Sequence, residues 1–206
     1  MDPALDAIKE AARKPIRVIA RLLNSLTGGH LHPHVVTFTG LVMHLPIAYF
    51  IADGKLILAA ILLIIFGLFD ALDGELARLQ KRASLTGMLF DSVTDRVKEI
   101  ILYAGITYAL VTSAHPLYAI WAAVAAGTSV LVSYINAWGD VVMTHNNSGH
   151  GVNKAFRGGL LRFEVRMFLL VLSLCFNNLS VFVVVVATLA WLTVVQRMIL
   201  ITRRLS

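Results

Sequence analysis

The stretch FDALDGELARLQKRASLTGMLFDSVTDR, residues 69–96, places four aspartates at the ends of two long apolar runs. They are Asp70, Asp73, Asp91 and Asp95. Hydrocarbon does not tolerate unpaired carboxylates: one aspartate near the centre of a bilayer costs about 2.5 to 3.5 kcal/mol even on a lenient insertion scale. Four of them beside membrane-spanning runs therefore require a compensating partner and indicate a functional site.

The spacing of the aspartates predicts how they meet. Asp70 and Asp73 are three residues apart, so on a helix both carboxylates project from one face. Asp91 and Asp95 are four residues apart and share a face in the same way. If the two faces meet, they form a cage of oxygen ligands, which suits hard divalent cations such as magnesium, calcium or manganese. Two such ions can hold the attacking and leaving oxygens of a phosphoryl transfer.

Two glycines and an arginine lie on the same faces. Gly74 follows Asp70 by one turn, and Gly87 precedes Asp91 by one turn. A missing side chain at these positions lets a ligand or a neighbouring backbone come close. Arg78 follows two turns after the first aspartate and is suited to bind a diphosphate.

Together these residues resemble the signature of a known family. The pattern Asp-x-x-Asp-Gly-x-x-Ala-Arg, then eight residues, then Gly-x-x-x-Asp-x-x-x-Asp, runs from Asp70 to Asp95. It is similar to the complete signature of the CDP-alcohol phosphotransferases, with every gap matched. The resemblance implies an integral-membrane enzyme of phospholipid biosynthesis. Such an enzyme would move a phosphatidyl group from CDP-diacylglycerol to a polar alcohol and release CMP.

The resemblance also implies roles for single residues. Asp70, Asp73 and Asp91 would be ligands of two magnesium or manganese ions, and Asp95 would be the catalytic base and a further metal ligand. Which carboxylate takes the proton is not fixed by the residues themselves. The cytidine diphosphate site would be lined by Gly74, Arg78 and Gly87.

An upstream segment extends the resemblance. Residues 33–40, PHVVTFTG, are similar to the family's Pro-Asn-x-x-Thr-x-x-Gly entry to the first span, with a histidine where asparagine is usual. This similarity adds His34 and Thr37 as expected nucleotide contacts.

The expected acceptor depends on a second stretch, Arg162-Phe163-Glu164-Val165-Arg166. Its two arginines are four residues apart, so on one helical face they are suited to bind a phosphate. The stretch resembles the Glu-Arg-x-Glu-Arg segment of family members that use inositol phosphate, which is therefore the expected acceptor. Asn136 and Trp138 stand where those members usually carry basic residues, so glycerol-3-phosphate is the alternative. Arg162 and Arg166 have a second explanation as anchors at the membrane interface.

The composition indicates a membrane protein made entirely of helices. The chain has 206 residues, 58% of them hydrophobic, and a mean hydropathy of +0.77, which is too apolar for a soluble domain. Residues 1–30 are expected to form an amphipathic helix on the headgroups, because one face is apolar and the other basic. Residues 31–206 are expected to form a domain of six transmembrane helices. Their expected bounds are about 35–52, 55–81, 85–112, 116–143, 163–176 and 180–201.

The charges predict an orientation and a set of partners. The net charge is +6, and lysines and arginines gather in segments expected on one side of the membrane. By the positive-inside rule, both termini and the acidic site face the cytoplasm, and the expected location is the plasma membrane. A soluble phosphorylated alcohol would reach the site there. No nucleic-acid partner is expected, because stacking aromatics are not interleaved with the basic residues.

Two further expectations concern other classes of function and the assembly. A small ion transporter would also place carboxylates in apolar helices, but it predicts charges at mid-bilayer and two related halves. The sequence has neither feature. A homodimer is expected from the family resemblance.

Overall fold

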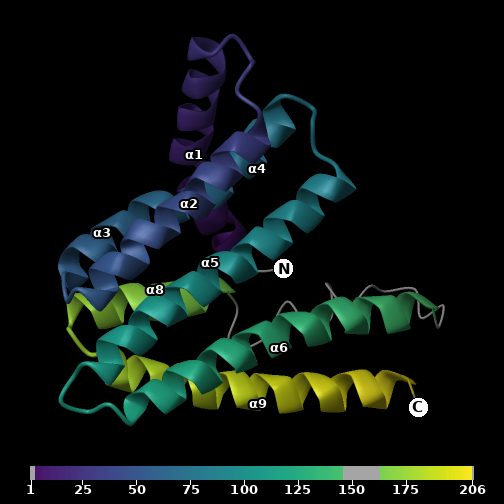
Figure 1. Cartoon of the computed structure of the whole chain (residues 1–206). Helices are drawn as coiled ribbons and strands as arrows, with labels where there is room; N and C mark the ends of the chain where they lie inside the picture. Colours follow the sequence, from purple (N-terminus) through teal and green to yellow (C-terminus); the bar gives the residue numbers. More distant parts are fainter. Residues whose placement is uncertain (1–2, 146–162, 206) are drawn as a thin grey trace. The chain divides into compact units, whose positions relative to one another are not determined.

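The computed structural model describes residues 3–145 and 163–205, which form helices and short turns and contain no strand (Figure 1). The helices are α1 (Pro3–Leu26), α2 (Pro33–Ala52), α3 (Leu56–Gly67), α4 (Phe69–Leu79), α5 (Leu85–Val111), α6 (Tyr118–His145), α8 (Phe163–Cys175) and α9 (Leu179–Leu205). The all-helical prediction is confirmed for the described residues.

The chain divides into two compact units. Unit 1 comprises residues 1–47 and 61–101, and unit 2 comprises residues 48–60 and 102–206. All the aspartates of the signature fall within unit 1.

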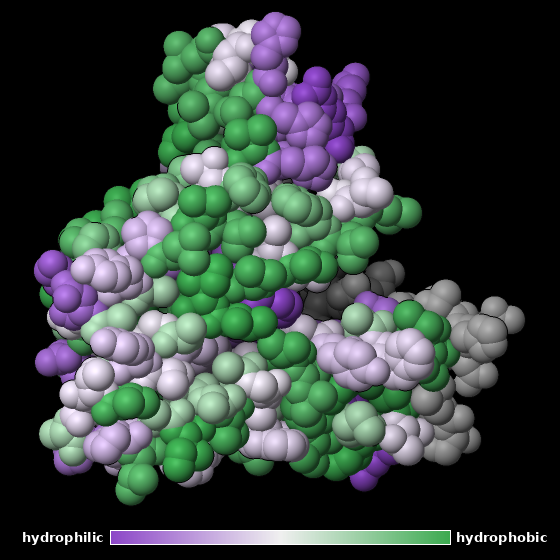
Figure 2. All heavy atoms as spheres, viewed as in Figure 1, coloured by the Kyte–Doolittle hydropathy of each residue, from purple (hydrophilic) through white to green (hydrophobic). Residues whose placement is uncertain are grey.

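Four helical segments are long and apolar enough to cross a membrane: Pro33–Ala52, Leu56–Leu79, Tyr118–Val142 and Leu179–Arg203. Helix α5 has sufficient length, but its first half carries charged residues, and the apolar part of α8, Val165–Cys175, is shorter. Large apolar side chains are exposed along the long helices, and Figure 2 shows broad apolar areas on the face it draws. Such surfaces are typical of proteins that contact lipid. Four of the six expected spans thus meet the criteria of length and composition.

Helix α1 packs on α4 within unit 1. The buried cluster at this contact contains Ala20 of α1, Leu72 and Leu76 of α4, and Val36 of α2, with Leu23 of α1 packed against it. Other apolar residues of α1 stay exposed, among them Val18, Ile19, Leu22 and Leu26. The helix therefore uses one part of its apolar surface for protein contact and leaves the rest available to lipid.

The helix expected over residues 55–81 is interrupted. Helix α3 ends at Gly67 and α4 begins at Phe69. The backbone N–H of Leu68 donates to the carbonyl of Ile65 at 3.3 Å, a tighter three-residue turn. A glycine at this point weakens the α-helix by about 1 kcal/mol relative to alanine. The interruption puts Asp70 in the first turn of a new helix, where the helix dipole favours a negative charge.

Helices α6 and α9 lie side by side in unit 2 (Figure 1). Small side chains on both helices are completely buried, including Ala122 and Ala125 of α6 and Ala187 and Ala190 of α9. Small residues let helix backbones approach closely in membrane proteins. The alanine-rich start of α6 therefore serves packing.

Another close approach in unit 2 joins α5 to α2. A Cβ atom on Gly105 would lie 2.9 Å from the Cα of Ala48, and it would also collide with the carbonyl group of that residue. The obstructing atoms are backbone, so a side chain at position 105 fits only if the two helices separate.

Gly105→Ala is therefore expected to lower the free energy of unfolding by about 1 to 3 kcal/mol, the usual cost of overpacking. Thermal unfolding of the purified protein in detergent measures this effect. Gly127→Ala in α6 is the matched control, because no atom lies within 4 Å of the Cβ that this change would add. The control is expected to be neutral or to stabilise by up to about 1 kcal/mol. An unchanged melting temperature for Gly105→Ala would contradict the close packing.

Candidate metal and nucleotide site

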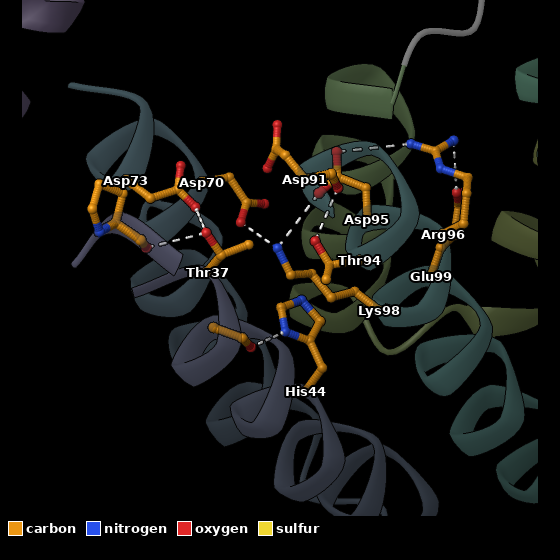
Figure 3. A network of polar contacts seen from close by, with 12 residues as sticks. Thr37, His44, Asp70, Asp73, Asp91, Thr94, Asp95, Arg96, Lys98 and Glu99 are labelled. Carbon is orange, nitrogen blue, oxygen red and sulfur yellow. Dashed lines mark hydrogen bonds and ion pairs between the residues drawn. The ribbon is translucent and has the colours of Figure 1, made fainter. Parts of the chain in front are cut away.

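Three of the four signature aspartates meet in unit 1. Asp70 comes from the start of α4, and Asp91 and Asp95 come from successive turns of α5. One carboxylate oxygen from each lies within 4.8 Å of the others, and all three residues are half-buried (Figure 3). The spacing in the sequence put Asp91 and Asp95 on one helical face, and in the structure this face meets the start of α4.

Asp73 lies outside this group of three. It is buried and accepts a hydrogen bond from the hydroxyl of Thr37, which lies in α2 one turn after Pro33. The same hydroxyl lies 3.3 Å from the carbonyl oxygen of Pro33. Thr37, expected as a nucleotide contact, therefore fixes the orientation of a carboxylate as well.

A lysine that the family signature does not contain lies among the carboxylates. Lys98 of α5 is only 1% exposed, and its ammonium group contacts Asp70 and lies 3.4 Å from Asp95 (Figure 3). Next to it, the buried His44 ring shares a hydrogen bond of 2.7 Å with the carbonyl of Gly40. Sequence reasoning missed both residues. The signal for Lys98 was its position three residues after Asp95, on the same helical face.

A pocket of about 540 Å³ adjoins the carboxylates. Its walls include all five residues expected to contact the nucleotide, together with two of the aspartates: His34, Thr37, Asp73, Gly74, Arg78, Gly87 and Asp91. This volume falls within the range of about 300 to 1,000 Å³ typical of cofactor pockets.

The two glycines keep space open in this pocket. A Cβ atom on Gly74 would contact the guanidinium group of Arg78 at 3.6 Å. A Cβ atom on Gly87 would lie 3.3 Å from the Ser84 hydroxyl and 3.6 Å from the His34 ring. The contacts with Arg78 and His34 are of ordinary van der Waals length, and only the Ser84 hydroxyl would have to move by a few tenths of an ångström.

Arg78 is held at the pocket by a buried acid. Its guanidinium group donates to Glu75 at 2.8 Å, while more than half of the arginine side chain stays exposed. The second carboxylate oxygen of Glu75 lies 3.6 Å from Arg17 of α1. Glu75 thus links the amphipathic helix to the basic residue of the pocket.

Comparison with models of protein families shows which family the chain belongs to. Residues 30–200 match the family model of the CDP-alcohol phosphatidyltransferases. The chain belongs to this family. The family and the enzyme class predicted from the signature are confirmed, and membership in a family of transferases argues against the ion transporter.

Named relatives of this phosphatidyltransferase include archaeal and bacterial enzymes. It is 27% identical over 202 residues to the archaetidylinositol phosphate synthase of Pyrococcus horikoshii, and the match covers 98% of each chain. It is 33% identical over 135 residues to the phosphatidylinositol phosphate synthase of Corynebacterium glutamicum, which covers 62% of this chain and 60% of that protein.

Solved structures show the same architecture. The phosphatidylinositol phosphate synthase of Mycobacterium tuberculosis with CDP-DAG bound has a TM-score of 0.77 and 25% identity, and the match covers 90% of this chain and 92% of that one. The same mycobacterial enzyme in complex with manganese and citrate has a TM-score of 0.76 at 25% identity, with coverages of 90% and 88%.

The carboxylates of the phosphatidyltransferase fit a divalent metal. The donors at the centre are carboxylate oxygens, the ligands that magnesium and manganese prefer. The Oδ1 atom of Asp91 is buried and has no hydrogen-bond partner within the described residues. A buried carboxylate oxygen without a partner is unfavourable, and a bound cation would satisfy it.

The expected acceptor residues lie in and near α8. Arg162 is outside the described residues. Arg166 is almost completely buried in unit 2. A further buried arginine of unit 2, Arg197 of α9, contacts the amide oxygen of Asn136 and lies 3.2 Å from the carbonyl of Val132. Sequence reasoning missed Arg197, although an arginine within an apolar span is itself a signal of function.

Proposed function

We propose that this phosphatidyltransferase moves a phosphatidyl group from CDP-diacylglycerol to inositol phosphate and releases CMP. The observation that carries the proposal is the pocket, whose walls combine the expected nucleotide contacts with Asp73 and Asp91. The names of the Pyrococcus and Corynebacterium relatives and the CDP-DAG in the mycobacterial structure support the acceptor and the donor.

The residues divide the work as follows. Arg78 binds the diphosphate of the donor, and Gly74 and Gly87 leave room for the nucleotide. Asp70, Asp73 and Asp91 hold the divalent metal, with Asp95 as a further ligand. When bound, the metal supplies positive charge that neutralises the diphosphate and the departing phosphate.

Asp95 acts as the general base in this proposal. It takes the proton of the acceptor hydroxyl, whose oxygen then forms a bond to the phosphorus that carries the lipid. The bond from that phosphorus to the bridging oxygen breaks, and CMP leaves with the bond electrons. Lys98, 3.4 Å from Asp95, holds this carboxylate in place through an ion pair.

We further propose six transmembrane spans, with α5 and α8 added to the four segments that meet the criteria for spans. Residues 1–30 would lie on the membrane surface and residues 31–206 would form the embedded domain. The distribution of lysines and arginines favours cytoplasmic termini and a cytoplasmic active site in the plasma membrane. A homodimer is part of the same proposal.

Arg162 and Arg166 are the proposed contacts of the acceptor phosphate, because they are four residues apart in the sequence and carry the charge that a phosphate needs. Glycerol-3-phosphate is the second candidate acceptor. It is favoured by Asn136 and Trp138, where inositol-phosphate-using members of the family usually carry basic residues.

Release of CMP by the purified protein in detergent tests the function. The assay contains manganese or magnesium and either CDP-diacylglycerol or a CDP-activated archaeal lipid, since the relatives differ in the lipid of their names. The acceptors are inositol phosphate, glycerol-3-phosphate, inositol and serine. Release with inositol phosphate is expected to exceed release with each other acceptor by at least about tenfold. Release with glycerol-3-phosphate alone would identify glycerol-3-phosphate as the acceptor in place of inositol phosphate. No CMP release with any combination of donor and acceptor would contradict the proposed function.

A further inference from the structure

Lys98 is the largest unexplained feature of the metal site. The family signature ends at Asp95, so it does not include this residue. A buried lysine is rare, because taking an ammonium group out of water is costly unless counter-charges surround it. At 1% exposure, Lys98 has these counter-charges in Asp70 and Asp95.

The other polar groups around Lys98 do not replace this pairing. The ring nitrogen Nδ1 of His44 is engaged with the carbonyl of Gly40 at 2.7 Å. Glu99, the next residue on α5, lies 3.4 Å from Arg96. The carboxylates that bind the ammonium group are thus two members of the expected metal cage.

The charges of the site bear on how many ions it binds. Asp70, Asp91 and Asp95 carry three negative charges when ionised. Asp73, the proposed fourth ligand, accepts a hydrogen bond from Thr37 and adds one more negative charge. The ammonium group of Lys98 neutralises one of the four charges and leaves three. One divalent ion brings the site to a single negative charge, and a second divalent ion without the diphosphate would leave it with an excess of positive charge.

We propose that Lys98 is a built-in cation of the metal site, which holds Asp70 and Asp95 together so that the free enzyme binds one divalent ion tightly and a second only weakly. This inference rests on the proposed function, because it concerns the same carboxylates. The tightly bound ion is the one that Asp91 binds, because the buried Oδ1 atom of this residue lacks a hydrogen-bond partner in the described part of the chain. The second ion binds well only when the diphosphate of the donor brings new negative charge.

Lys98 acts in this inference as a positioning residue. Two carboxylates at this separation repel each other, and the ammonium group between them removes that repulsion before any metal binds. The cage is therefore formed in advance, and less free energy is spent on ordering it when the ion arrives.

Titration of the full-length protein with Mn²⁺, without donor or acceptor, tests the inference. Isothermal titration calorimetry and electron paramagnetic resonance both count the bound ions. The wild-type protein is expected to bind one ion tightly, and a second at least about tenfold more weakly, because one unit charge at this range changes an interaction by that much or more. Lys98→Met keeps an unbranched side chain that is one atom shorter and removes the charge. It is expected to bind two ions with affinities within about tenfold, and the resonance spectrum should show coupling between neighbouring ions.

Lys55→Met is the matched control. Lys55 lies in the turn before α3, is exposed and pairs with Asp53 at 2.8 Å, so its replacement should leave the count of ions at the wild-type value. Two tight ions in the wild-type protein would overturn the inference, even if Lys98→Met does not fold. A single ion in a folded Lys98→Met protein would overturn it as well. If the wild-type protein binds no ion, the inference is overturned as well.

These outcomes are separate from a failure of the proposed function. Release of CMP with two equally tight ions would leave the function standing and remove the role of Lys98. One tight ion without CMP release from any donor and acceptor pair would support Lys98 and contradict the proposed reaction.

Discussion

Asp91→Asn is expected to reduce CMP release by at least about 100-fold, because it removes a metal ligand from the centre of the site. The same change should not destabilise the metal-free protein. The Oδ1 atom of Asp91 is buried without a hydrogen-bond partner in the described residues, and a neutral amide relieves the burial of a charge beside Asp70 and Asp95. Activity and stability are therefore expected to move in opposite directions, as at many functional sites.

Two measurements check this result: CMP release with saturating manganese, and thermal unfolding in the presence of a chelator. The expected melting temperature equals or exceeds that of the wild-type protein. Asp53→Asn is the control, because Asp53 lies in an exposed turn and its ion pair with Lys55 is remote from the signature in sequence. It should change neither quantity by more than a small amount. Full activity of Asp91→Asn would remove this residue from the list of metal ligands.

Asp95→Asn is expected to lower CMP release by at least about 100-fold for a different reason, the loss of a general base. In contrast to Asp91→Asn, this change is expected to lower the free energy of unfolding. Lys98 loses one of its two counter-charges. Breaking a buried ion pair costs about 3 to 5 kcal/mol when the remaining charge has no other partner. Since Asp70 remains, we expect a loss nearer to 1 to 3 kcal/mol, about the cost of one unsatisfied buried group.

Comparing the two aspartate variants separates ligand from base. With a chelator present, Asp95→Asn should unfold at a lower temperature than Asp91→Asn. In the manganese titration, Asp91→Asn should lose the tight ion, whereas Asp95→Asn should weaken the binding of that ion without abolishing it. Retention of more than about a tenth of wild-type CMP release by Asp95→Asn would place the base elsewhere.

Part of the site followed from spacing. The intervals put each pair of aspartates on one helical face, and the family resemblance implied that Gly74, Arg78 and Gly87 line the nucleotide site. In the structure, three of the aspartates meet, and the two glycines and Arg78 lie in the walls of one pocket. Such patterns are informative because helix geometry converts fixed intervals into fixed directions. The helix bounds also agreed closely, because long apolar runs end at clear turns.

The parts that sequence reasoning missed depend on contacts between distant residues. Lys98 and Arg197 are single basic residues outside any motif, and their partners are known only once the helices pack. The interruption at Leu68 is a single turn with a hydrogen bond between residues three apart, in an otherwise continuous apolar run. The number of spans is also difficult to predict, because the first half of α5 combines charged residues with a length sufficient to cross the membrane.

The contact between α1 and α4 joins a helix to one that is synthesised later, after α2 and α3. Until Leu72 and Leu76 have been synthesised, the apolar side of α1 around Ala20 has no protein partner in this contact. An amphipathic helix in that situation binds the nearest apolar surface, which is the bilayer itself. The helix is thus expected to dock on lipid during synthesis and to exchange part of that contact for α4 once the second span has been inserted. The order of synthesis therefore makes assembly of unit 1 depend on a membrane being present in the interval between synthesis of α1 and synthesis of α4.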